Sequence, residues 1–155
     1  MKKTMILVLK IILGAGILFG LYVVGAILYA QLTDYKPKPE EQAEVLIPKE
    51  KLPEINKDTF VFYDWNIGYC GLGKESDFFY DGGKMVRPTK ALSEKNFNGF
   101  IETISKWKTD ADFINIQEID RNSKRSYHIE QFQKAFETLG NFKAVFGKNY
   151  DVKYV

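Results

Sequence analysis

An uncharged apolar run near the N-terminus constrains this chain most. Residues 11–30, IILGAGILFGLYVVGAILYA, contain no charged side chain. Twenty helical residues rise by about 30 Å, which matches the hydrocarbon core of a bilayer. Lys2, Lys3 and Lys10 lie before the run or at its edge, and positive charge there predicts a cytoplasmic N-terminus. We therefore expect a transmembrane anchor over residues 1–31, with the rest of the chain outside the cytoplasm.

A cleaved signal peptide is the alternative interpretation of this run. The apolar region of a signal peptide usually spans about 7 to 15 residues and ends at a small-residue cleavage site. Here the run is longer, and Leu28 stands where a small residue is required before Ala30. Both departures favour an uncleaved, single-pass anchor in the cell membrane.

Residues 32–57 differ from the apolar run in composition, and this composition predicts a tether. They carry four prolines and many charges without a sustained apolar period, which is typical of a segment that packs against nothing. Setting aside Lys2, Lys3 and Lys10 leaves 19 Lys and Arg against 20 Asp and Glu. The part of the chain after the anchor is thus nearly neutral, which argues against a non-specific duplex binder without excluding nucleic acid.

The remainder of the chain alternates between strand and helix patterns. β-prone runs occupy residues 59–66, 111–118 and 142–146, and apolar residues recur at helical spacing over 93–107 and 129–139. Strand, helix, strand, helix, strand in this order predicts an α/β layer architecture with parallel or mixed strands.

Polar side chains stand at the ends of the first two predicted strands. Asn66 ends the first strand, and Gln117 and Glu118 end the second. In layered α/β folds, ligand sites form beyond the carboxyl ends of strands. An amide oxygen and a carboxylate are hard oxygen ligands of the kind that Mg²⁺ takes. The alternative is that Asn66 caps a turn and Glu118 is a solvated strand end.

The stretch FYDWNIGY, followed by a helix and then by DADFINIQEIDRNSKRS, resembles the N-terminal half of the endonuclease/exonuclease/phosphatase family. That family includes DNase I-like nucleases and neutral sphingomyelinases. The resemblance covers about residues 58–155, and its specific feature is a strand ending in Asn66 before a strand ending in Gln117-Glu118. It implies that these residues form the N-terminal half of a two-sheet α/β sandwich.

The same resemblance implies roles for single residues. Glu118 would bind a catalytic Mg²⁺, or Mn²⁺ in its place, and Asn66 would support the metal or its water. Arg125 and Asn149 would contact substrate, although a solvated loop arginine and an ordinary strand residue are the alternatives. The implied activity is phosphoester hydrolysis, with a lipid head group, a small phosphoester or nucleic acid as substrate.

The family domain also has a second half, with a further Asp-x-Asn strand tip and a late Ser-Asp-His segment, and these 155 residues contain no such half. We therefore expect an enzyme fragment that is inactive alone. The alternative is a non-catalytic, membrane-tethered binding module on the same scaffold. Neither interpretation predicts a protein partner. Cys70 is the single cysteine, and we expect it to be a partly buried, unreactive thiol.

Overall fold

The computed structural model describes residues 2–49, 51–52, 54 and 56–151. The described residues form two compact units, one of residues 2–42 and 148–151 and one within 43–147. In chain order the elements are α1 (Lys2–Thr33), β1 (Glu44–Leu46), β2 (Phe62–Asn66), η1 (Gly68–Cys70), η2 (Phe79–Asp81), α2 (Lys90–Trp107), β3 (Phe113–Gln117), α3 (Gln131–Leu139) and β4 (Ala144–Phe146).

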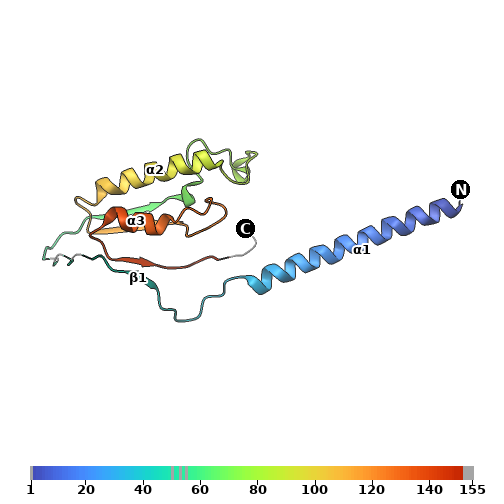
Figure 1. The fold of residues 1–155 in the computed structure, drawn as a ribbon, viewed down its shortest axis with the longest axis horizontal. Helices are drawn as coiled ribbons and strands as arrows, with labels where there is room; N and C mark the ends of the chain where they lie inside the picture. Colours follow the sequence, from blue (N-terminus) through green and yellow to red (C-terminus); the bar gives the residue numbers. More distant parts are fainter. Residues whose placement is uncertain (1, 50, 53, 55, 152–155) are drawn as a thin grey trace. The chain divides into compact units, whose positions relative to one another are not determined.

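The first unit consists mainly of α1, a single long helix (Figure 1). It has 32 residues and none of them is buried. Within the described part of the chain, α1 is the one helix long and apolar enough to cross a membrane, judged by length and composition. The predicted long, apolar N-terminal helix is thus confirmed, and its insertion in a membrane stays a prediction. Its direction across a membrane stays a prediction.

In the second unit, β2 and β3 pair in parallel and are connected through α2. Phe62 lies opposite Phe113, and Asn66 lies opposite Gln117. The two polar strand ends therefore belong to adjacent strands. Successive side chains of a strand point to opposite faces of the sheet. One face therefore carries Tyr63, Trp65, Ile114 and Ile116, which are half-buried, and the other carries the exposed Asp64, Asn66, Asn115 and Gln117.

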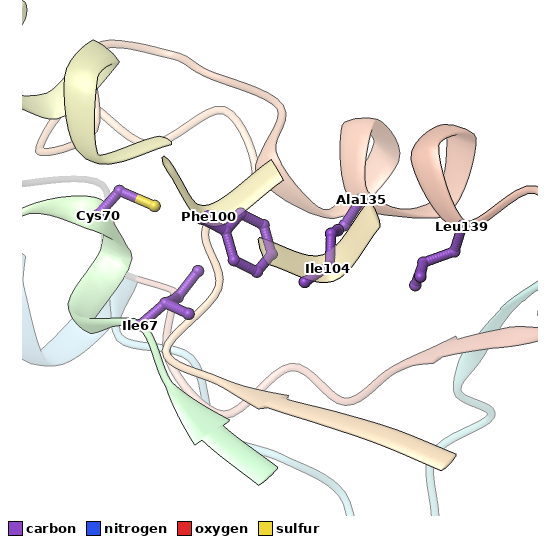
Figure 2. Packing of buried hydrophobic residues seen from close by; sticks show 6 residues of the cluster. All are labelled: Ile67, Cys70, Phe100, Ile104, Ala135 and Leu139. Atoms are coloured by element: carbon purple, nitrogen blue, oxygen red, sulfur yellow. The ribbon is translucent and has the colours of Figure 1, made fainter. Parts of the chain in front are cut away.

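Helices α2 and α3 cover the apolar face of this sheet and form the core with it (Figure 2). Phe100 and Ile104 are one helical turn apart on α2, so both point to the same side, and they are 2% and 0% exposed. Ala135 and Leu139 do the same on α3. Trp65 of β2 packs against this cluster with its ring 5.8 Å from that of Phe100. The predicted amphipathic helices are therefore confirmed.

A second, antiparallel pair joins β1 to β4, with Val45 opposite Val145. The expectation of a tether without packed elements therefore does not hold for residues 44–46. The carboxylate of Glu44 forms an ion pair with Arg121. A three-residue strand has no measurable periodicity, so its pairing depends on a partner about 100 positions further along the chain.

Candidate functional site

The strand-end residues Asn66 and Glu118 lie side by side in the structure. Asn66 Nδ2 donates a hydrogen bond to Glu118 Oε1 at 2.9 Å, across 52 positions of sequence. The amide oxygen of Asn66 accepts the N–H of Gly68 at 2.9 Å. Because a backbone N–H must face an acceptor, this bond fixes the amide with its NH2 group towards Glu118.

A left-handed backbone conformation directs Glu118 to Asn66. Asn66 and Gln117 are opposite one another, so their side chains share a face of the sheet. In a regular strand the next residue would point to the other face. Glu118 instead has φ +53°, a conformation that non-glycine residues rarely adopt. This turn interrupts the alternation of side chains between the two faces of the sheet, and the carboxylate of Glu118 can therefore reach Asn66. Backbone strain of this kind concentrates at functional sites.

The exposed face of the sheet carries a short polar network next to this pair. Asp64 Oδ1 accepts hydrogen bonds from Asn115 Nδ2 at 2.6 Å and from Gln117 Nε2 at 3.2 Å. Gln117 thus donates a hydrogen bond at the strand end, and its partner is the carboxylate of Asp64, which was not among the predicted site residues. The network adds a second acidic side chain to the face that holds Asn66 and Glu118.

Arg125 lies in an ion pair and against an aromatic ring. Its Nη2 is 2.8 Å from Asp120 Oδ1, its Nε is 3.1 Å from Asp120 Oδ2, and its guanidinium carbon lies 4.1 Å from the centre of the Tyr69 ring. This is a fork-like contact of a planar cation with a carboxylate. A Cβ at Gly71 would be 2.1 Å from Tyr69 Cε2, so glycine makes room for the ring.

Residues 67–71 after β2 are buried and uncharged, and the loop after β3 brings charged side chains next to them. Burial raises the pKa of the Tyr69 hydroxyl, and Glu118 and Asp120 add to the rise while Arg125 opposes it. Burial also raises the pKa of the Cys70 thiol to about 12, with a smaller contribution from Asp120. A thiol with such a pKa stays protonated at neutral pH, which agrees with the expectation of an unreactive cysteine.

The remaining predicted residue, Asn149, lies outside any strand. β4 ends at Phe146, and Asn149 is exposed in the segment that belongs to the first unit. The alternative of an ordinary strand residue is therefore wrong, and the contact of Asn149 with a substrate stays a prediction. The single histidine, His128, is exposed, and its Nδ1 lies 2.9 Å from Asn122 Oδ1.

The chemistry of the donor set fits a water-rich divalent cation. Mg²⁺ is usually bound by one or two carboxylates and keeps several waters. Glu118 is an exposed carboxylate held in place by a neutral amide, so it can supply one carboxylate ligand to a cation that keeps its waters. Across the described residues, no three His, Cys, Asp or Glu side chains form a preformed metal cluster.

Tyr69, Asp120 and Asp64 are site residues that the sequence did not indicate. Each takes part through contacts over the loops or across the strands, and the two quoted stretches contain these residues without indicating a role for them. Asp120 stands two positions after Glu118, and this spacing was the one sequence feature that could have indicated that Asp120 lies near the candidate site.

Comparison with known proteins adds no relative: no family model, no curated protein and no solved structure matches this chain.

Proposed function

We propose that this chain carries part of the active site of a membrane-anchored, metal-dependent phosphoester hydrolase. The observation that carries the proposal is the hydrogen bond between Asn66 and Glu118 at the carboxyl ends of two adjacent parallel strands. Such strand ends are the usual place of ligand sites in layered α/β folds. The order of these residues in the sequence also supports the resemblance to the endonuclease/exonuclease/phosphatase family.

In this proposal Glu118 is the metal ligand and Asn66 holds it. The Asn66 amide directs its NH2 group at Glu118 Oε1, and its oxygen accepts from Gly68. Asn66 thus restricts the carboxylate to one orientation, which lowers the entropy lost when a cation binds. A bound Mg²⁺ or Mn²⁺ would supply Lewis-acid polarisation of a phosphoryl oxygen.

Arg125 is the residue proposed to favour an anionic ligand at this edge. Its guanidinium is held by Asp120 and by the Tyr69 ring, so its direction is set before any ligand arrives. A planar guanidinium suits phosphate oxygens because it presents several N–H donors in a fixed fork. Since Asp120 neutralises part of its charge, Arg125 would orient a phosphoester more than attract it from a distance.

The two-sheet sandwich is part of the same proposal. The face of β2 and β3 turned away from the helices exposes Phe62 and Phe113, at 60% and 47%, and Phe60 beside them at 49%. Parallel sheets are usually covered on both faces, so a second layer over these rings would complete the fold. The apolar helix α1 favours a lipid head group or another phosphoester near a membrane as substrate.

The metal site is tested with Mn²⁺, which broadens the NMR signals of nuclei close to it. The experiment uses the full chain in lipid nanodiscs, and the reporter is the side-chain NH2 group of Asn66. We expect Mn²⁺ to broaden this signal selectively, and Mg²⁺ to reverse the effect by competition. Glu118→Gln should weaken Mn²⁺ binding by at least roughly tenfold, since it removes the charge from a hard-ion ligand.

The matched control is Glu102→Gln, the same substitution at an exposed residue of α2 that pairs with Lys106. It should leave the broadening of Asn66 unchanged. In the presence of Mg²⁺, dimethyl phosphate should shift the Asn66 and Arg125 side-chain signals, and it should shift neither without the metal. Equal broadening in Glu118→Gln and the parent chain would exclude Glu118 as ligand. No selective broadening at all would favour the non-catalytic binding module.

A further inference from the structure

Gln131 is a fully buried polar residue that no step of the proposed chemistry uses. It is the first residue of α3 and is 0% exposed. Its Oε1 accepts the backbone N–H of Asp120 at 2.9 Å. Its Nε2 donates to the backbone carbonyl of Tyr69 at 2.9 Å, across 62 positions of sequence. One side-chain amide therefore joins the loop after β2 to the loop after β3.

These two loops carry the proposed site. Tyr69 follows Asn66 by three positions, and Asp120 follows Glu118 by two. The loops also bond to each other directly, because the Tyr69 N–H donates to the Glu118 carbonyl at 2.8 Å. Both Tyr69 and Glu118 have positive φ angles, +46° and +53°. Such conformations persist where surrounding contacts over-determine them.

The contacts close into a ring of four residues. Gln131 binds the backbone of Tyr69 and of Asp120. The Asp120 carboxylate holds Arg125, and the Arg125 guanidinium lies over the Tyr69 ring. Each member thus contacts two others, and Tyr69 also bonds to the carbonyl of Glu118, the residue whose backbone turn directs its side chain to Asn66.

We infer that Gln131 is a positioning residue that locks the loops of Asn66 and Glu118 in the geometry needed to hold a divalent cation. The part of the inference that concerns the cation rests on the proposed function. The part that concerns the fixed position of the two loops rests on the structure alone. A glutamine suits this place because it offers a donor and an acceptor on one neutral group. A methionine of the same length fills the space and leaves a buried N–H and a buried carbonyl without partners.

The test compares Gln131→Met with Gln133→Met in the full chain in nanodiscs. Gln133 lies on the same helix, and its side chain contacts Glu137 instead of the loops. The readout is hydrogen exchange at the Tyr69 backbone N–H, which bonds to Glu118 and not to Gln131. Its protection falls only when the two loops separate. The core amide of Ile104 serves as the reference for the rest of the fold.

We expect Gln131→Met to lower the protection of the Tyr69 amide by roughly tenfold or more, with Ile104 changed less than about twofold and Gln133→Met without effect. It should also weaken Mn²⁺ binding at Asn66, although Glu118 is intact. An equal loss at Ile104, no loss at Tyr69, or the same loss in Gln133→Met would overturn the inference. So would unchanged Mn²⁺ affinity in Gln131→Met.

The two hypotheses fail in different ways. If the parent chain binds no Mn²⁺, the proposed function fails. The hydrogen-exchange result still shows whether Gln131 holds the two loops together. If Gln131→Met does not fold, the parent chain provides the measurement. The Gln131 side-chain NH2 protons should then exchange much more slowly than those of Gln133, and equal rates for the two side chains would overturn the lock.

Discussion

At the scale of single residues, the unusual feature is a group of strained backbone positions around the strand ends. Tyr69, Cys70 and Glu118 all have φ between +46° and +58° although none is glycine. Each such residue costs of order 1–3 kcal/mol and needs compensating contacts. Tyr69 has them in Arg125 and Gln131, and Cys70 in its burial. Among the described residues, three of the six non-glycine residues with positive φ thus lie at the candidate site, and the other three, Asn122, Tyr127 and His128, lie further along the segment after β3.

Cys70 gives a prediction with a defined pH window. Its thiol pKa is about 12 in the folded chain against an ordinary value of 9.0. Because the folded pKa is the higher one, the stabilising effect of the neutral thiol is complete below pH 9 and is lost as the pH rises towards 12. Within that window the unfolding free energy should fall by up to about 1.4 kcal/mol per pH unit from this group.

The measurement is unfolding of the chain by denaturant between pH 8 and pH 11, with Cys70→Ala as the control that lacks the thiol. The difference between the two slopes isolates the thiol from lysines and tyrosines that titrate nearby. Iodoacetamide should label the unfolded chain at pH 8.5 and leave the folded chain unlabelled. Rapid labelling of the folded chain would show that the thiol is neither buried nor neutral.

Among the elements, the helices and the parallel strands could be predicted from local sequence patterns, but β1 could not. The paired strands β1 and β4 are three residues each, and a proline-rich, charged sequence surrounds β1. The pair is stabilised by three cross-strand contacts and by the ion pair of Glu44 with Arg121. Such pairing is visible only when both strands are placed in space.

We predict that β1 stabilises the second unit. Replacing Glu44–Leu46 by Gly-Ser-Gly removes three cross-strand pairs, worth up to about 1 kcal/mol each. The unfolding free energy should drop by about 1–3 kcal/mol. Tryptophan fluorescence reports it, because the only two tryptophans, Trp65 and Trp107, lie in this unit. The same replacement at residues 36–38, outside this unit, should change nothing, and equal effects would mean that β1 has no specific role.

At the scale of the whole molecule, the chain combines an apolar helix with a small, separate α/β unit. The helix α1 has no buried residue, and the second unit has its own core between β2, β3, α2 and α3. A helix of this length and composition could bury its apolar surface in a bilayer, as the predicted membrane anchor requires. The α/β unit depends on its own packing.

The whole-molecule prediction concerns membrane attachment. The chain should stay with membranes after extraction at alkaline pH, and deletion of residues 2–33 should release it. An alkaline phosphatase fused after residue 33 should be active, since Lys2, Lys3 and Lys10 favour a cytoplasmic N-terminus. Release of the intact chain by alkali would argue against a membrane-spanning α1. An inactive fusion together with an active cytoplasmic reporter would reverse the orientation.

Local sequence patterns are enough to predict α1, the two strand ends and the amphipathic faces of α2 and α3. These features depend on neighbours within a few positions, and local periodicity records them. The sequence also predicts that Asn66 and Glu118 lie at strand ends, because polar residues that end apolar strands are visible in it.

Which side chains contact one another depends on the three-dimensional packing of the elements. The Asn66 amide faces Glu118 because Gly68 fixes its oxygen, and Gln131 reaches Tyr69 across 62 positions. Contacts of this kind leave no periodic trace in a sequence. They arise when parallel pairing brings distant loops to the same edge of the sheet, and buried polar atoms there must find partners.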